Sequence, residues 1–344
     1  MGGVLLDVAL GDPRRGHPVA AFGVAASRLE RALYRDDRLR GLAYTMVLVG
    51  APALLAGWLE VRALRSRPLL VAAVTWAALG GRSLGREARA VGDAVAAGDL
   101  ATARCRVPAL VGRDPTGLDG AELCRAAVES VAENTADAVI ASLWWGAVGG
   151  TAGVVAHRCA NTLDAMVGHR SPRHRRFGTA SARLDDGLAW VPARLTAALA
   201  VLLAPVVGGS VARAAAVARR DGHRSPSPNS GWSEAAFAGA LGVRLGGVNR
   251  YGTGPGARLE ARGPLGEGPA PTPVDVARAV RLSQAVTAAA ALLAVVPALL
   301  RGRRGGGRSG VHDRVVPGVT EPVAGLLGVL PWGARVTTAS PATR

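Results

Sequence analysis

Long apolar runs alternate with polar segments along this chain. A helix that crosses a membrane needs about 20 mainly apolar residues. Residues 42–61, 138–156 and 282–300 approach or reach that length. A fourth run, 195–209, is short alone but becomes a full span when 188–194 joins it. The pattern predicts an all-α integral membrane protein with four to five transmembrane helices.

A fifth apolar run, 68–80, is too short for a span by itself. It predicts a re-entrant segment, or a hairpin with the first span. The alternative to a membrane protein is a soluble helical protein with alanine-rich core helices. Composition alone does not separate the two, although hydrophobic residues make up 49% of the chain and charged residues 19%, against about 25% charged in an average soluble domain.

Two substantial polar segments separate the spans. Residues 82–137 predict amphipathic helices on either side of a loop at 112–117. Residues 221–272 are rich in Gly, Pro, Ser and Asn and predict mostly irregular loop. We therefore expect one polytopic membrane domain over 1–304 and a partly flexible C-terminal tail over 305–344.

Basic residues number 41, the net charge is +16, and every basic residue is arginine. Without lysine, the chain has neither a P-loop lysine nor a Schiff-base amine. Phosphate must then be held by arginine, backbone N–H groups or a metal ion. The arginines lie in loops between apolar runs rather than on one face, so we expect no nucleic-acid partner.

Acidic residues recur every four positions at Glu129, Glu133 and Asp137, immediately before an apolar run. On a helix these three side chains share one face. Carboxylates in such a row repel one another unless a cation or arginine neutralises them, and Mg²⁺ binds carboxylate oxygens together with substrate phosphates. The row predicts a Mg²⁺ site for a nucleotide. The alternative is a solvated helix face paired with Arg125.

Polar residues also follow the apolar run 138–156. His157, Asn161 and Asp164 fall on one helical face, and a basic turn containing Arg170 comes next. Arginine clusters bind phosphate in bidentate fashion. They also contact anionic lipid headgroups, and both interpretations stay open.

The next motif places Arg183 before Asp186, Trp190 and Arg194, which repeat every four residues, with Pro192 among them. Proline removes a backbone hydrogen bond from a helix. A broken helix with charged residues often lines a cavity. The alternative is a structural ion pair between Asp186 and Arg194.

Two further motifs are weak when taken singly. Asp12 and His17 belong to a Gly-Asp-Pro turn followed by His-Pro, which is also ordinary turn chemistry. Ser227 and Asn229 stand in a Ser-Pro-Ser-Pro-Asn segment that is also typical of a proline-rich linker.

Taken together and in order, these segments resemble one family over most of the chain. The matching motifs are Leu-Leu-Asp with Gly-Asp-Pro and His-Pro near the start, Val-Gly-Arg-Asp at 111–114, Val-Glu-Ser-Val-Ala-Glu-Asn-Thr-Ala-Asp at 128–137, Asn-Thr-Leu-Asp-Ala-Met-Val-Gly at 161–168, Ser-Ala-Arg-Leu-Asp-Asp at 181–186, Trp-Val-Pro-Ala-Arg-Leu-Thr at 190–196 and His-Arg-Ser-Pro-Ser-Pro-Asn at 223–229. The set is similar to the cobalamin biosynthesis proteins called CobD or CbiB, the adenosylcobinamide-phosphate synthases.

The resemblance implies an enzyme that joins a propionate carboxylate of adenosylcobyric acid to (R)-1-amino-2-propanol or its O-phosphate, driven by ATP and Mg²⁺. It implies a multi-pass protein of the cytoplasmic membrane, in contact with lipid and with other cobalamin-assembly enzymes as candidate partners.

Roles can then be assigned to the candidate residues. Glu129, Glu133, Asp137 and Asp164 would hold Mg²⁺ on ATP. Catalytic roles fall to Asp12, His17, Asp186 and Arg183, among which Asp12, Asp186 or His17 would take the ammonium proton and Arg183 would clamp phosphate. Cofactor contacts fall to Asn134, Asn161, Arg170, Arg194, Ser227 and Asn229.

Two other classes of protein use similar residues. A membrane transporter would also carry charges within its spans, but it predicts inverted repeats, and the sequence has no repeat of that kind. A non-catalytic membrane anchor for cobalamin enzymes would not need so many Asp, Glu and Asn residues at the ends of its spans.

Overall fold

The structure is a computed structural model that describes residues 1–12, 17–169, 171, 173–252 and 258–305. Residues 1–301 form one unit by their internal contacts, and the expected tail lies outside the described residues from position 306 onward. The α-helices and strands are α1 Gly2–Leu10, α2 Pro18–Leu33, α3 Arg38–Arg62, α4 Arg67–Leu79, α5 Gly81–Ala96, α6 Leu100–Arg106, α7 Gly120–Asn134, α8 Ala141–Val167, α9 Thr179–Leu202, α10 Val211–Asp221, α11 Ser230–Leu241, β1 Leu245–Tyr251, β2 Arg258–Leu265 and α12 Pro273–Gly305.

The helical membrane character is confirmed, but fewer spans meet the length requirement than the sequence predicts. Within the described residues, three helical segments are long and apolar enough to cross a membrane: Arg38–Arg62, Gly120–Val167 and Pro273–Ala294. The run at 68–80 falls in α4, whose 13 residues are too short. The run expected at 195–209 divides, because α9 ends at Leu202 and a short 3₁₀ turn, Ala204–Val207, follows. Pro192 lies inside α9, which continues through it.

The second span contains two departures from α-helical geometry. A π-helical segment, Thr135–Ile140, joins α7 to α8, and α8 itself breaks at Gly150, whose φ is 59°. A break frees backbone N–H groups, which must find partners where water is scarce. Glu60 of α3 supplies the acceptor: its Oε2 lies 2.6 Å from the N–H nitrogen of Thr151 and 2.7 Å from the Thr151 hydroxyl.

The π-helical segment changes which side chains share a face. Each π turn takes in an extra residue relative to an α turn. Glu129 and Glu133 lie in α7, whereas Asp137 lies within the π-helical segment. The expected continuous stripe of three carboxylates is therefore divided, and its members meet different neighbours.

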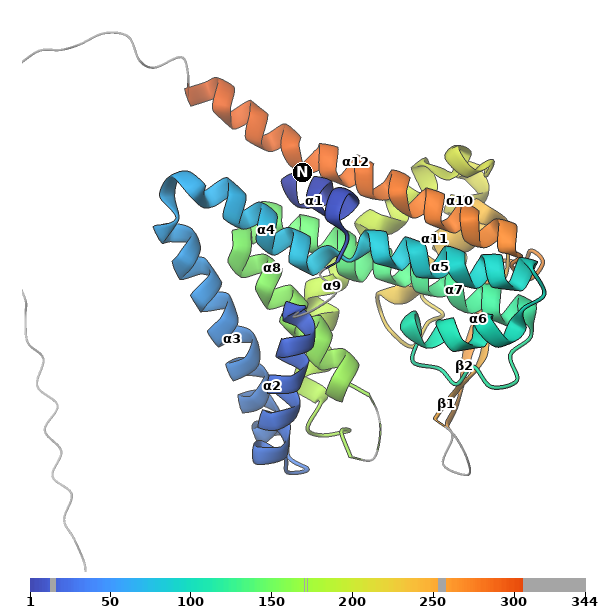
Figure 1. Ribbon diagram of the computed structural model, residues 1–344, viewed down its shortest axis with the longest axis horizontal. Coiled ribbons are helices and arrows are strands. Elements are labelled where there is room, and N and C mark those ends of the chain that lie inside the picture. Colours follow the sequence, from blue (N-terminus) through green and yellow to red (C-terminus); the bar gives the residue numbers. More distant parts are fainter. Residues whose placement is uncertain (13–16, 170, 172, 253–257, 306–344) are drawn as a thin grey trace, which may run out of the picture. The chain divides into compact units, whose positions relative to one another are not determined.

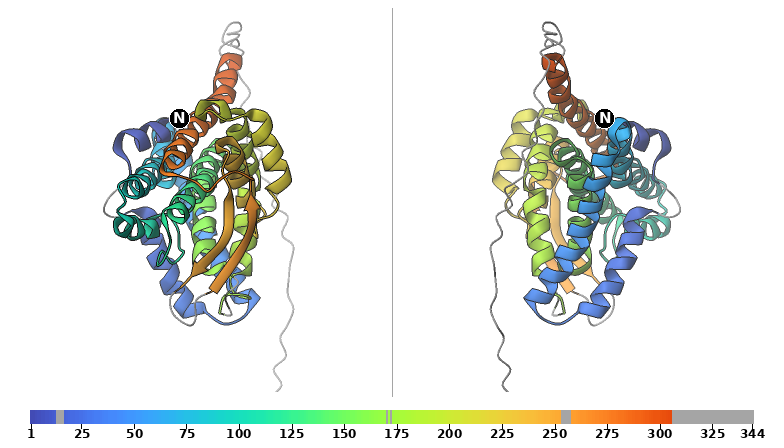
Figure 2. Two further views of the ribbon diagram at one scale, coloured as in Figure 1. Left: turned by 90° about the vertical axis from the view of Figure 1, so that its right-hand side faces the viewer. Right: turned by 90° about the vertical axis from the view of Figure 1, so that its left-hand side faces the viewer.

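The segment 221–272 is not mostly irregular loop, so that expectation is wrong. It contains α11 and an antiparallel hairpin in which β1 pairs with β2, with a shift of register between Leu245 and Gly247. Glycine and proline are frequent here because the turns and the bulge need them, and their abundance hides the helix and the strands. Figure 2 (left) shows the hairpin in front of the helices.

The buried apolar side chains form two clusters. The larger takes in α5, α7 and α9–α12, with Leu123, Phe237 and Leu282 fully buried in it. The smaller joins α2, α3 and α8 around Tyr44 and Phe177, whose ring centroids are 5.1 Å apart. Figure 1 shows α2, α3 and α8 at the left and α5–α7 with the hairpin at the right. Helix α9 packs against both α8 and α11 and so contacts both groups.

Candidate functional site

Glu129 forms a buried network with two arginines and the hairpin. Its Oε2 lies 2.5 Å from Nη2 of Arg113, and its Oε1 lies 3.3 Å from Nη1 of Arg125. Oε1 also accepts a hydrogen bond from the backbone N–H of Gly246 in β1. Both arginines donate to Oδ1 of Asn249. Because its oxygens are taken by guanidinium and N–H groups, Glu129 is neutralised by arginine, and the metal role expected for it is not supported by its contacts.

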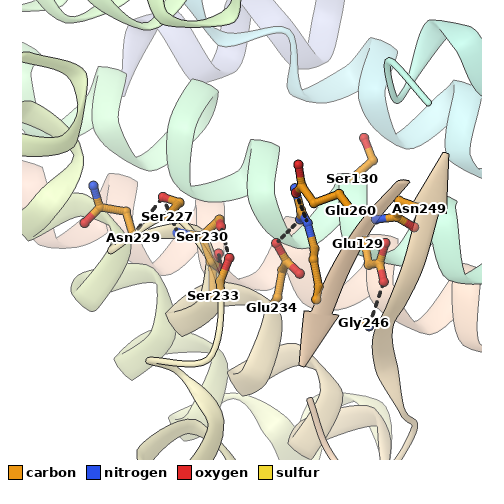
Figure 3. Close-up of polar contacts among 12 residues, drawn as sticks. Glu129, Ser130, Ser227, Asn229, Ser230, Ser233, Glu234, Gly246, Asn249 and Glu260 are labelled. Carbon is orange, nitrogen blue, oxygen red and sulfur yellow. Dashed lines mark hydrogen bonds and ion pairs between the residues drawn. The ribbon is translucent and has the colours of Figure 1, made fainter. Parts of the chain in front are cut away.

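A second group of charges lies between α11 and the hairpin. Arg262 of β2 donates to Glu260 and to Glu234, as Figure 3 shows for the two glutamates beside the strands. Glu234 is fully buried. Burial, reinforced by the charges of Glu133 and Glu129, raises the pKa of Glu234 well above its ordinary value. Glu133 of α7 is half-buried and interacts electrostatically with Arg262.

Carboxylates of the π-helical segment, α8 and α9 lie near enough to one another to interact electrostatically. Asp137 of the π-helical segment interacts electrostatically with Asp185 of α9 and with Arg158 and Asp164 of α8. Burial, with the nearby charges of Asp164, Asp186 and Glu133, raises the pKa of Asp185 to about 7, opposed by a hydrogen bond with Asn161. Asn161 also accepts a long hydrogen bond, 3.4 Å, from Arg158. We call Asp137, Arg158, Asn161, Asp164 and Asp185 the acidic cluster.

The donor chemistry of the acidic cluster fits Mg²⁺. Its carboxylate and amide oxygens are the ligands that Mg²⁺ takes, usually together with water and substrate phosphates. Oδ1 of Asp185 and Nε of Arg158 are buried and have no hydrogen-bond partner in the described part of the chain. No three His, Cys, Asp or Glu side chains already stand in metal-binding geometry anywhere in that part. A metal there would therefore draw further ligands from a bound phosphate.

Arg194 and Asn229 join α9 to the segment before α11. Oδ1 of Asn229 accepts from Nη1 of Arg194 at 2.6 Å, and its Nδ2 donates to the backbone carbonyl of Asp186. The Arg194 guanidinium lies 4.6 Å and 5.3 Å from the ring centroids of Trp190 and Trp232. Asp186 and Arg194 are thus linked through Asn229, and Asp186 also interacts electrostatically with Asp164 of the acidic cluster.

Of the other predicted residues, one adjoins the acidic cluster and the rest make local contacts or are exposed. Asp12 interacts electrostatically with Arg158 and so adjoins the acidic cluster. His17 caps α2, since its Nδ1 accepts from the N–H of Val19. Asn134 donates to Ser130 within its own helix. Arg183 is exposed.

Two further predicted residues complete the set. The hydroxyl of Ser227 accepts from the N–H groups of Asn229 and Ser230 at the start of α11, where Figure 3 shows these side chains together. Arg170 lies outside the described residues.

Several residues of the site have no role in the sequence-based prediction: Arg113, Arg158, Asp185, Glu234, Asn249 and Arg262. The four-residue spacing to Trp190 and Arg194 selects Asp186 and passes over its neighbour, Asp185. The sequence feature that could have pointed to Asp185 is its position directly next to Asp186. Glu234 and Arg262 give no signal, because they are distant from each other in sequence.

Comparison with known proteins identifies close relatives. The family model described as CobD/Cbib protein matches residues 1–283. The chain is 53% identical over 295 residues to a protein of Mycobacterium tuberculosis, covering 86% of this chain and 93% of the relative. It is 46% identical over 257 residues to one of Pelobacter propionicus, covering 72% and 80%. It is 39% identical over 314 residues to one of Rhodobacter capsulatus, covering 86% and 95%. All three are named cobalamin biosynthesis protein CobD. No solved structure matches.

Proposed function

The chain belongs to the CobD/Cbib family and so acts in cobalamin biosynthesis, and we propose that it is the amide-forming ligase of that pathway. Its substrates would be a propionate carboxylate of adenosylcobyric acid and the amine of (R)-1-amino-2-propanol or its O-phosphate, with ATP as the energy source. The observation that carries the proposal is the convergence of Asp137, Asp164 and Asp185 beside Arg158. We place the protein in the cytoplasmic membrane, where its apolar helices suit it to contact lipid.

The reaction needs an activated carboxyl group. A carboxylate resists attack by an amine, and it becomes reactive when one of its oxygens attacks the γ-phosphorus of ATP and ADP leaves. The amine nitrogen then attacks the carbonyl carbon of the acyl phosphate, and inorganic phosphate departs. Phosphoryl transfer of this kind depends mainly on positioning and on neutralising charge.

The acidic cluster suits the binding of ATP as a magnesium complex. Asp137, Asp164 and Asp185 would hold Mg²⁺, with Glu133 nearby, and the ion would offset the negative charge of the phosphates. Arg158 is the one cation within the cluster as defined above, and it interacts electrostatically with Asp137, Asp185 and Asp12. Its guanidinium would orient a substrate carboxylate or phosphate.

The amine substrate must lose a proton before it can attack. Asp12 and Asp186 are the candidates to accept this proton, because both adjoin the cluster electrostatically and neither is among the carboxylates that would hold Mg²⁺. Arg194, fixed by Asn229 beside Asp186, would clamp a phosphate at the edge of the site.

Substitution within the acidic cluster tests this assignment. Asp137→Asn and Asp185→Asn keep the shape of each side chain but remove its charge. We expect ATP-dependent amide formation to fall by about 10- to 100-fold, with a higher Mg²⁺ requirement. Asp36→Asn, at an exposed acidic residue outside the cluster, is the matched control. Wild-type rates for both cluster variants at limiting Mg²⁺ would show that the metal assignment is wrong.

A further inference from the structure

A cavity lined by none of the residues of the acidic cluster lies between α1, α5 and α12. Its volume is about 730 Å³. The polar side chains that line it are Asp7, Arg82, Arg86, Arg89, Asp93, Ser283, Gln284 and Thr287, and small and apolar side chains make up the rest of the wall. We call it the α1–α5–α12 groove. No step of the proposed ligase reaction uses these arginines.

The groove presents a row of positive charge. Arg82, Arg86 and Arg89 stand at helical spacing on α5 and are all exposed. Arg82 uses Nη1 to bind the carbonyls of Val8 and Ala9 at the end of α1. Nε of Arg86 pairs with Glu87, and Nη2 of Arg89 donates weakly, at 3.4 Å, to Gln284. A guanidinium has five N–H donors, so each arginine keeps donors for a ligand.

Asp7 lies beside this row with capacity for a further hydrogen bond. The Asp7 side chain is buried, at 6% exposed. Oδ2 accepts the backbone N–H of Arg82 at 3.0 Å, whereas Oδ1 has no partner in the described part of the chain. Oδ1 therefore remains able to accept one further hydrogen bond. Burial is the main cause that raises the pKa of Asp7.

The wall opposite the arginines belongs to a candidate membrane span. Ser283 and Gln284 lie within Pro273–Ala294 and line the groove. The α1 side chains Leu5, Val8 and Leu10 are 62–64% exposed. Polar groups and arginines between helices, with apolar surface beside them, form the kind of basic pocket that binds phosphate-bearing headgroups.

We propose that the α1–α5–α12 groove binds a phosphate ester anion, with the phosphate held by Arg86 and Arg89 and bounded by Arg82, Asp7 and Gln284. Guanidinium groups bind phosphate through paired N–H donors. Ser283 connects the groove to the catalytic region, because its hydroxyl lies 2.6 Å from that of Thr135 at the start of the π-helical segment. A direct hydrogen bond thus joins a residue that lines the groove to the segment that carries Asp137. The ester is either an anionic lipid headgroup or a soluble phosphate ester.

Binding of defined phosphate probes to purified full-length protein in neutral detergent tests the proposal. The probes are dihexanoyl phosphatidylglycerol, dihexanoyl phosphatidylcholine and the soluble ester glycerol 3-phosphate, which is not a substrate of the proposed ligase reaction, each titrated by microscale thermophoresis. The variants are Arg86→Gln, Arg89→Gln and their double. Arg219→Gln, an exposed arginine on α10, is the matched control. Thermal unfolding checks that each variant is folded.

We expect the double variant to bind the preferred probe roughly 25-fold more weakly, at about fivefold for each arginine, while Arg219→Gln binds like the wild type. Preference for phosphatidylglycerol over phosphatidylcholine identifies a lipid ligand, and preference for the soluble ester identifies a free phosphate ligand. Equal affinities for all probes, or an equal loss in the folded double variant and in Arg219→Gln, would overturn the proposal. Failure of amide formation alone leaves this binding result unaffected, so the two proposals fail separately.

Discussion

Arg113 and Glu129 form an ion pair in which both side chains are almost fully buried, at 4% and 3% exposed. Arg113 comes from the loop before α7, and Glu129 from the middle of α7. The pair fixes that loop to the helix, and the additional bond from Gly246 to Glu129 fixes the hairpin to the same carboxylate. The four-residue spacing favours a metal role for Glu129. Its contacts indicate a structural role instead.

Glu129→Ala should therefore act on stability. Removing one partner of a buried ion pair leaves an uncompensated charge, which lowers the free energy of unfolding by about 3–5 kcal/mol. Thermal or denaturant unfolding in detergent measures this loss. Asp36→Ala, at an exposed acidic residue, is the control and should change the free energy of unfolding little. If Glu129→Ala is as stable as the wild type but needs more Mg²⁺ for activity, Glu129 is a metal ligand after all.

Gly150 should resist substitution because it forms the break in α8. Its φ of 59° is strained for any residue with a side chain, and an added Cβ would lie 2.5 Å from Oε2 of Glu60. Gly150→Ala should destabilise the contact between α3 and α8 by about 1–3 kcal/mol. Gly50→Ala is the control, since an added Cβ there meets nothing within 4 Å. Equal melting temperatures for the two variants would contradict the structural role assigned to the break.

Asp221 makes the free energy of unfolding depend on pH in the acid range. It is fully buried, pairs with Arg220 and Arg224, and accepts the N–H of Gly266 just after β2. Its hydrogen bond from Arg220 is the main cause that lowers its pKa below the ordinary value of 3.8. Because the folded protein binds the proton less tightly than the unfolded chain, this contribution to stability is fully present above that ordinary value. It is lost as pH falls through the lower pKa of the folded state.

Unfolding followed between about pH 2 and pH 6 measures the effect. Asp221→Asn removes the titrating group, so we expect the variant to be less stable near neutral pH and its stability to vary less at acid pH. Asp36→Asn should keep the wild-type pH profile. A variant Asp221→Asn with an unchanged acid profile would show that other carboxylates produce the dependence.

Apolar run length is sufficient to place the first and last spans. The run at 42–61 falls within α3, and the run from 282 falls within α12, because about 20 apolar residues have few alternatives to crossing a membrane as a helix. The hairpin escapes sequence-based prediction for a physical reason. The alternation of its strands is broken by glycines at the bulge, Gly246 and Gly247, and such glycines are equally typical of loops.

The site is predictable where its residues share a helix. Spacing on one face selects Asn161 and Asp164, and both adjoin Asp185. The π-helical segment cannot be predicted from the spacing, because Glu129, Glu133 and Asp137 fit an uninterrupted α-helix equally well. Pairs such as Arg262 and Glu234 depend on tertiary contacts between segments that are distant in the chain. Local pattern carries no information about them.

A labelling measurement tests whether the protein forms the amide at the expense of ATP. The purified protein is incubated with Mg²⁺, ATP, aminopropanol O-phosphate and adenosylcobyric acid whose reacting carboxylate carries ¹⁸O on both oxygens, and the products are analysed by mass spectrometry. We expect the amide product to retain one ¹⁸O and the released inorganic phosphate to gain the other. No amide product, or an amide formed at the same rate without ATP, would contradict the account.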